Sequence, residues 1–136
     1  MREVERSRFV RATPSELEPH LTPRALVAAE GSFEVLDVAE RDEATLVTAG
    51  ARGLALTLRF ERRGGGVYYA QEGEAGPFDA METWVTVRRK NEGSILTVRS
   101  QVSLGLPLPA LSDRLAAWKR GGELDRALDS IAAAVE

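Results

Sequence analysis

For about 70 residues after Gly31, side-chain character alternates with the period of a β-strand, and this pattern constrains the fold more than any other feature. The run from Leu54 to Phe60 alternates large apolar residues with smaller or polar ones, as expected of a strand with one buried face. Short turn-prone segments such as Gly64-Gly65-Gly66 separate the strands, so neighbouring strands should pair as antiparallel hairpins. With a first strand near the N-terminus, seven strands are predicted, over residues 2–10, 32–39, 44–49, 54–61, 66–73, 79–89 and 96–104.

Two short helices are predicted between the first and second strands, because a capping threonine is twice followed by proline. Thr13-Pro14-Ser15-Glu16 has capping-box spacing, with the proline at the first helical position, where its missing N–H costs nothing. Pro19 interrupts this helix early. Thr22-Pro23 starts a second helix over about 23–29, which ends near Gly31.

A third helical pattern runs to the C-terminus after Leu106-Pro107-Leu108-Pro109 stops the last strand. Its apolar residues form two sets that are out of phase. Ten residues separate Trp118 from Leu128, which leaves a mismatch of about 80° at roughly 100° per residue. Gly121-Gly122 lies between the sets, so we predict one long helix that is kinked or interrupted there. The first set is Leu111, Leu115 and Trp118, and the second is Leu124, Leu128, Ile131 and Val135.

Composition excludes several kinds of chemistry. The chain has 136 residues with no Cys and a single His, His20. Disulfides, thiolate chemistry, Cys-ligated metals and multi-histidine metal sites are therefore excluded, although carboxylates alone could still hold a hard cation. We predict neither a metal nor a cofactor. Its 18 basic and 21 acidic residues give a net charge of −3, which does not support nucleic-acid binding. The length corresponds to one domain, residues 1–136.

No targeting or membrane-spanning segment is visible. The N-terminal residues 1–6 include acids and precede no apolar run, unlike a signal peptide. No stretch approaches the ~18 consecutive apolar residues of a transmembrane helix. We therefore expect a cytoplasmic protein without a membrane span.

The order of the predicted elements resembles that of the START/SRPBCC superfamily, which includes polyketide cyclase/dehydrase-like proteins. Residues 7–17 resemble the family's opening strand and helix start, Gly76-Pro77-Phe78 its penultimate strand pair, and residues 93–98 its last strand. The resemblance implies an α+β helix-grip fold of order β-α-α-β-β-β-β-β-β-α. In this fold a seven-stranded curved antiparallel sheet wraps around a long C-terminal helix. It also implies an apolar cavity between sheet and helix for a lipid-like, polyketide-like or aromatic ligand.

The hairpin loop at Gly64-Gly65 decides which residues of the following strand face inward. A two- or four-residue loop places Tyr69 opposite Phe60 and Gln71 inward beside it. A three-residue loop would instead turn Tyr68, Ala70 and Glu72 inward. We favour the first arrangement, because a buried Glu72 would need a partner or a raised pKa.

Strand parity gives the rest of the expected cavity. Between residues 79 and 89 the more apolar set includes Met81, which leaves Trp84 on the outer face. An outward Trp84 would mark a contact surface such as that of a homodimer. The residues expected to line the cavity are Leu54, Leu56, Leu58, Phe60, Tyr69, Gln71, Met81, Thr83, Val85, Leu96, Val98, Ser100, Leu111, Leu115 and Trp118.

This lining holds few groups able to move a proton, which favours a container over a catalyst. No catalytic residue is assigned. Glu72 and Glu82 are acid–base candidates only if their strands face the other way, and His20 is expected at the surface or at a helix cap. The leading hypothesis is binding or carriage of an apolar small molecule. The alternatives are a polyketide cyclase/dehydratase-type enzyme and a structural or dimerisation module with a filled core.

Overall fold

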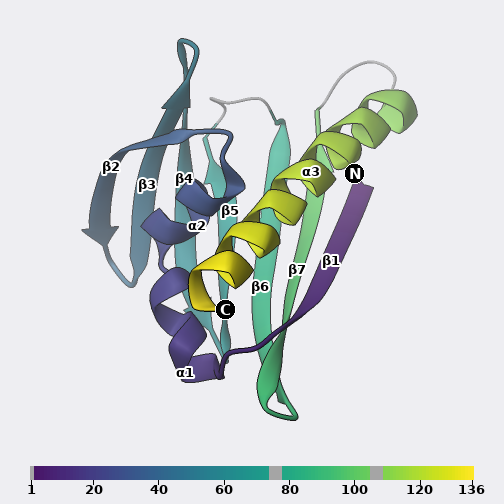
Figure 1. Ribbon diagram of the computed structural model, residues 1–136. Helices are drawn as coiled ribbons and strands as arrows, with labels where there is room; N and C mark the ends of the chain where they lie inside the picture. The colour runs from purple at the N-terminus through teal and green to yellow at the C-terminus, as the bar shows by residue number, and fades with distance from the viewer. Residues whose placement is uncertain (1, 74–77, 105–108) are drawn as a thin grey trace.

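The chain folds into a seven-stranded sheet and a long C-terminal helix, as predicted (Figure 1). The computed structural model describes residues 2–73, 78–104 and 109–136. The elements are, in chain order, β1 (Arg2–Val10), α1 (Pro14–Leu17), the short 3-10 helix η1 (Glu18–His20), α2 (Pro23–Glu30), β2 (Glu34–Arg41), β3 (Ala44–Ala51), β4 (Leu54–Arg63), β5 (Gly66–Glu72), β6 (Ala80–Lys90), β7 (Gly93–Ser103) and α3 (Pro109–Val135).

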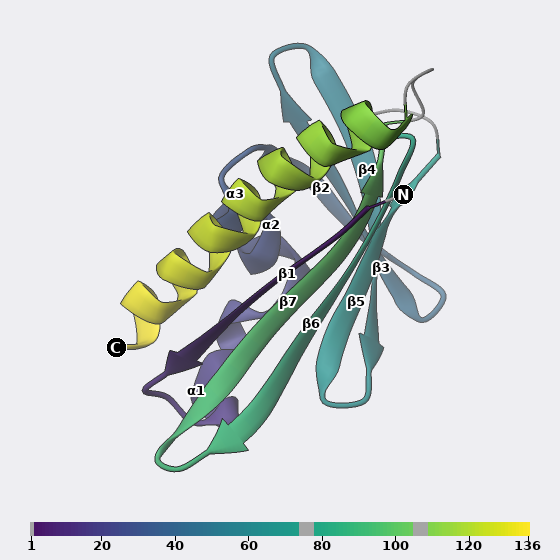
Figure 2. The same cartoon turned by 90° about the vertical axis from the view of Figure 1, so that its right-hand side faces the viewer.

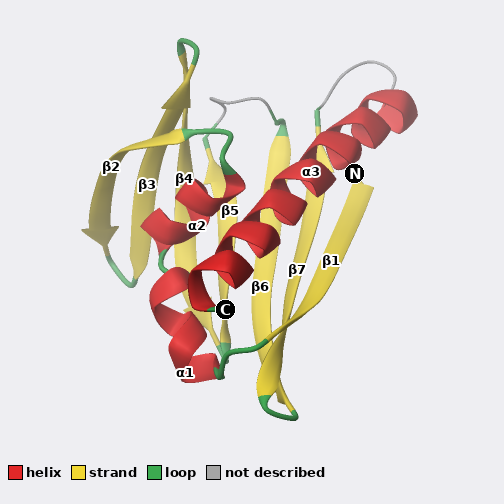
Figure 3. Ribbon diagram, viewed as in Figure 1, coloured by secondary structure: helices red, strands yellow, loops and turns green. Residues whose placement is uncertain are grey.

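The sheet is antiparallel throughout, with strand order β1-β7-β6-β5-β4-β3-β2. Consecutive strands are neighbours except β1, which pairs with β7 and so brings the two halves of the chain together. The helices lie on one face of the sheet, with α3 crossing it diagonally (Figures 2 and 3). The inward faces of the strands therefore line the space between the sheet and the helices.

The register of β4 and β5 is the one expected from a two- or four-residue hairpin loop at Gly64-Gly65. Phe60 pairs with Tyr69 and Leu58 with Gln71, so Tyr69 faces α3. Trp84 lies on the outer face, half-buried. There its ring centroid is 5.4 Å from that of Tyr68, and the Arg99 guanidinium lies 4.1 Å above it.

The predicted capping box at α1 is present. The Thr13 hydroxyl accepts a hydrogen bond of 3.2 Å from the Glu16 amide, and the Glu16 carboxylate accepts one of 3.0 Å from the Thr13 amide. The cap holds Leu17 in the core, where it is fully buried.

The helix α3 runs through Gly121 and Gly122 without a break, so the predicted interruption is wrong. Gly121 instead lets the helix approach β1, because a Cβ there would lie 2.6 Å from Arg6 Nη2 and 3.5 Å from Val4 Cγ2. None of the described helices is long and apolar enough to cross a membrane.

The apparent change of phase in α3 arose from counting only apolar residues. Its buried face has one helical period, but several of the positions on that face are polar or small. Leu111, Leu115 and Trp118, predicted to face the cavity, are 59%, 59% and 80% exposed. The buried positions are Ser112, Asp113, Ala116, Arg120, Glu123, Leu124, Ala127, Leu128, Ile131 and Ala132.

Candidate functional site

A buried arginine occupies the middle of the space between the sheet and α3. Arg120 is 1% exposed and points its guanidinium at the inward faces of β5, β6 and β7. Its Nη2 donates to the Tyr69 hydroxyl at 2.7 Å and to Thr83 Oγ1 at 2.9 Å, and its Nε donates to Ser100 Oγ at 3.1 Å. Thr83 and Ser100 also share a hydrogen bond of 2.8 Å. Three polar residues of the expected cavity lining are thus bound to one side chain.

Two carboxylates complete the coordination of this guanidinium. Nη1 donates to Glu123 Oε1 at 3.0 Å, one turn along α3, and to Glu30 at the end of α2. All five N–H groups of the guanidinium therefore have an acceptor. Glu30 also accepts a hydrogen bond from the Tyr69 hydroxyl. We call this group, which comprises Arg120, Glu30, Glu123, Tyr69, Thr83 and Ser100, the Arg120 cluster.

Burial and charge act against each other in the Arg120 cluster. Burial, the largest single effect, would lower the pKa of Arg120, but the interactions with Glu30, Tyr69 and Glu123 together outweigh it and raise that pKa well above its usual value. Burial, the largest single effect, opposes ionisation of Glu123, yet the charge of Arg120, hydrogen bonds from Ser32 and Arg120 and the charge of Lys119 together hold its pKa below the usual value. Burial raises the pKa of Tyr69, which keeps the hydroxyl protonated. The cluster is therefore a buried triad of charged groups, Arg120 between Glu30 and Glu123, with neutral hydroxyl partners.

The other expected cavity residues divide into two groups. Leu56, Leu58, Phe60, Met81, Val85, Leu96 and Val98 are buried on the inward face of the sheet, beside the Arg120 cluster. Leu54 is not: it is 54% exposed where β4 begins, beyond the edge of the core. Leu54 therefore lies at the periphery, as do the three exposed residues of α3. Those three face outward because the inner face of α3 carries Arg120 and the other polar positions around it.

The sequence analysis did not predict the charged members of the cluster because of their residue type. Charged side chains are rarely buried, so the apolar pattern did not point to Arg120, Glu30 or Glu123. A usable signal was present in α3: extending the second apolar set backwards from Leu124 by four residues at a time reaches Arg120 and then Ala116. Nothing comparable marks Glu30, whose role depends on where α2 ends relative to α3.

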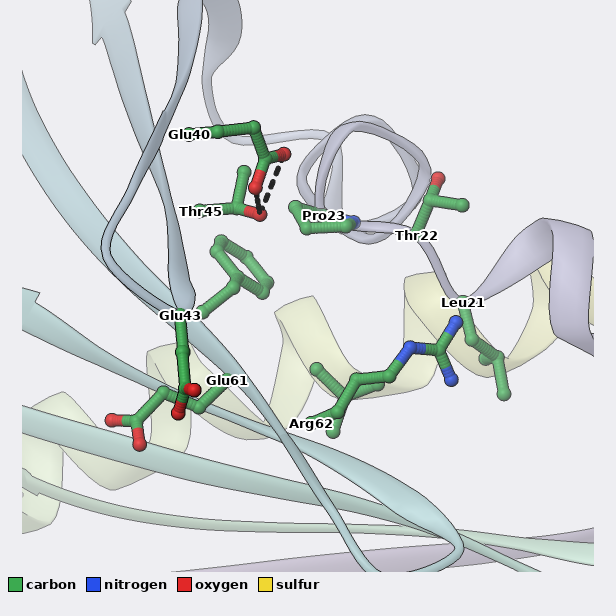
Figure 4. Close-up of a pocket in the computed structure, with 10 residues that line it drawn as sticks. Leu21, Thr22, Pro23, Glu40, Glu43, Thr45, Glu61 and Arg62 are labelled. Atoms are coloured by element: carbon green, nitrogen blue, oxygen red, sulfur yellow. Dashed lines mark hydrogen bonds between the residues drawn. The ribbon is translucent and has the colours of Figure 1, made fainter.

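A surface cleft of about 500 Å³ opens beside the Arg120 cluster, between the start of α2 and strands β2 to β5 (Figure 4). Its floor includes Phe60, which is 2% exposed and whose ring stacks on Tyr69 with centroids 4.5 Å apart. On its rim Thr45 donates to both oxygens of Glu40, at 3.0 and 3.1 Å. The lining is Leu21, Thr22, Pro23, Glu40, Glu43, Thr45, Phe60, Glu61, Arg62 and Val67.

Gln71 is also placed inward but is incompletely satisfied. Its Nε2 donates to the Phe78 carbonyl at 2.6 Å. Its Oε1 is buried and has no hydrogen-bond partner among the described residues. An unmatched acceptor in an apolar wall can take a donor from a small molecule or a water.

No family model and no curated protein sequence matches the chain. Solved structures do match it. A crystal structure of a Thermus thermophilus protein is 18% identical, with a TM-score of 0.71, and the match covers 99% of this chain and 100% of that one. A START superfamily protein from Mycobacterium smegmatis is 12% identical, with a TM-score of 0.72, covering 98% and 96%.

A third match is the di-domain ARO/CYC StfQ of the steffimycin biosynthetic pathway, 13% identical with a TM-score of 0.68. It covers 96% of this chain but 50% of StfQ, so the chain spans half of the di-domain protein. At these identities the similarity concerns the fold. Together with the strand order and the long α3, it establishes that the chain has the helix-grip fold of the START/SRPBCC superfamily.

Proposed function

We propose that the protein binds a small apolar or amphipathic molecule, and that the cleft in Figure 4 is its binding site. The observation that carries this proposal is that Phe60, whose side chain is only 2% exposed, is among the residues that line the cleft. Its volume of about 500 Å³ is in the range of small-molecule sites. Four apolar residues, Leu21, Pro23, Phe60 and Val67, line the cleft together with six polar or charged ones, a composition that suits an amphipathic molecule.

The Arg120 cluster displaces this site from the place that the sequence predicts. An apolar ligand lying between α3 and the middle of the sheet would separate Arg120 from Glu30 and Tyr69. Breaking a buried ion pair by removing one partner costs about 3–5 kcal/mol, more than an apolar contact there would restore. The ligand is therefore expected on the α1–α2 side of the cluster, with the stacked rings of Phe60 and Tyr69 as the wall between them.

The charges at the rim limit the polar end of the ligand. Glu40, Glu43 and Glu61 line the cleft, against one cation, Arg62. Arg62 already pairs with Glu18 at 3.4 Å. An anionic head group would meet this negative rim, so we expect a neutral or cationic molecule.

The test uses the neutral probe N-phenyl-1-naphthylamine, whose fluorescence rises in an apolar site. Thr45 faces the cleft, whereas Thr48 lies on the same strand and faces the outer side. We expect Thr45→Trp to fill the cleft and abolish probe binding, and Thr48→Trp to leave it unchanged. Circular dichroism and urea unfolding verify that both variants fold.

Native mass spectrometry of protein purified from its own host, with extraction of co-purifying molecules, supplies the ligand. A stoichiometric apolar molecule would support the proposal. Wild-type protein that arrives empty and binds no probe would refute it, as would equal binding by the two variants.

A module with a filled core is the second candidate, favoured by the complete pairing of the Arg120 guanidinium. In that case the outer sheet face around Trp84 is the expected contact surface of a homodimer. An empty protein whose dimer, measured by light scattering, is lost in Trp84→Ala would support this candidate over ligand binding.

A further inference from the structure

An apolar surface remains at one end of the molecule after the cleft and the cluster are accounted for. Leu111, Leu115 and Trp118 form an i, i+4, i+7 stripe on the exposed side of α3. Leu54 is exposed where the β3–β4 hairpin turns. Exposed side chains of this size are costly in water and mark contact surfaces when they gather.

The stripe and the hairpin belong to one surface. A second cleft, of about 370 Å³, is lined by Lys119 from α3 together with Arg52 and Leu54 from the hairpin. Figures 1 and 2 both place the β3–β4 hairpin and the start of α3 at the same end of the molecule. We call Arg52, Leu54, Leu111, Leu115, Trp118 and Lys119 the docking face.

The docking face carries two cations, Arg52 and Lys119, and beside Trp118 it borders Arg6 and Arg126 with one carboxylate, Asp125, which is paired with Arg6. The described lining of its cleft contains Arg52 and Lys119 but no carboxylate. Arg52 has no ion-pair partner in the described part of the chain. Lys119 lies 3.5 Å from Glu123, yet its side chain remains 56% exposed. A partner for this face should therefore be apolar and anionic together.

A second copy of the chain does not fit these charges. In a two-fold dimer the same patch meets itself, which would bring the cations of the two copies together. An anionic bilayer fits them well, because tryptophan prefers the membrane interface, leucines insert below it and basic residues are drawn to acidic lipids. We propose that the docking face binds peripherally to the surface of a membrane containing anionic lipids.

The experiment measures binding to vesicles of phosphatidylcholine with and without phosphatidylglycerol. The wild-type protein should float with the mixed vesicles, release in high salt and bind the neutral vesicles weakly. Emission from Trp118 should shift to the blue on binding, since it leaves water, and Trp118→Ser should abolish that shift. Arg52→Gln should weaken binding about fivefold, the loss expected for one basic residue at such a surface.

A matched control separates position from exposed apolar area. Leu36 on the edge strand β2 and Leu115 on α3 are almost equally exposed, at 58% and 59%, but only Leu115 belongs to the docking face. Leu115→Ser should weaken vesicle binding and Leu36→Ser should not.

Three outcomes would overturn the proposal: folded wild-type protein that ignores the mixed vesicles, equal weakening in the two leucine variants, or a light-scattering dimer that Trp118→Ser abolishes. Binding of N-phenyl-1-naphthylamine, measured on the same variants without vesicles, should stay intact. The two assays are therefore independent: vesicle binding can be absent while the proposed ligand binding is present, and ligand binding can be absent while vesicle binding is present.

Discussion

Replacing Arg120 by methionine tests the central claim that a buried ion pair occupies the space between sheet and helix. Methionine keeps much of the volume and the apolar stem but removes the charge and all five hydrogen bonds of the guanidinium. Glu123 would then lie buried with its 3.5 Å contact to Lys119 as the remaining ion pair, and Glu30 would lose its cation.

The expected magnitude follows from leaving charge unpaired. Removing one partner of a buried ion pair costs about 3–5 kcal/mol. The side chains of Glu30 and Glu123 are 13% and 3% exposed, so water relieves little of this loss. Against a typical total stability of about 5–15 kcal/mol the effect is large. For a domain of this size it corresponds to a fall in Tm of about 10–20 °C.

The assay is urea unfolding followed by circular dichroism, with Arg126→Met as the control. Arg126 also reaches Glu30 and Ser32, through hydrogen bonds of 2.9 and 3.3 Å, but it is exposed. Its loss should cost under about 1 kcal/mol.

Adding Glu30→Gln and Glu123→Gln to Arg120→Met provides an internal check. With the charges removed together, the triple variant should regain the part of the loss that comes from unpaired buried charge and be more stable than Arg120→Met alone. A loss below about 1 kcal/mol in Arg120→Met alone would refute the reasoning, since it would mean that the carboxylates are solvated.

Two further predictions concern pH and backbone packing. The pKa of Glu123 is lowered in the folded state, so its contribution to stability is present above the unfolded value near 4.5 and is lost as pH falls below it. Glu123→Gln should therefore flatten the acid limb of the wild-type curve of unfolding free energy against pH, and an unchanged limb would contradict the pairing. A Cβ on Gly66 would overlap the carbonyl oxygen of Val85, whereas one on Gly65 meets nothing within 4 Å. Gly66→Ala should cost about 1–3 kcal/mol in urea unfolding and Gly65→Ala should be near neutral, so equal values would disprove the close approach.

Local patterns were sufficient to predict most of the fold. Two-residue alternation and hairpin turns predicted the seven strands, and the loop at Gly64-Gly65 correctly predicted that Tyr69 faces inward. Both hydrogen bonds of the capping box at Thr13 were predicted correctly. These features depend on neighbours close in the chain, which the sequence displays directly.

The Arg120 cluster was harder to predict, because it depends on which face of α3 packs against the sheet. Hydrophobicity favoured Leu111, Leu115 and Trp118, yet the helix buries the face that carries Arg120. A buried arginine is stable only where acceptors converge, and its acceptors come from α2, β5, β6 and β7 as well as α3. That convergence is not visible in any local window.

The sequence by itself determined the element order, the antiparallel pairing and the caps, because each is decided by the period, turn chemistry and hydrogen bonding of adjacent residues. The tertiary structure decided how the interior is filled. Glu30 and Arg120 are 90 residues apart in the chain and meet only when α2 and α3 are both packed on the sheet. Their pairing offsets the cost of burying charge, on a helix that leaves Leu111, Leu115 and Trp118 facing outward.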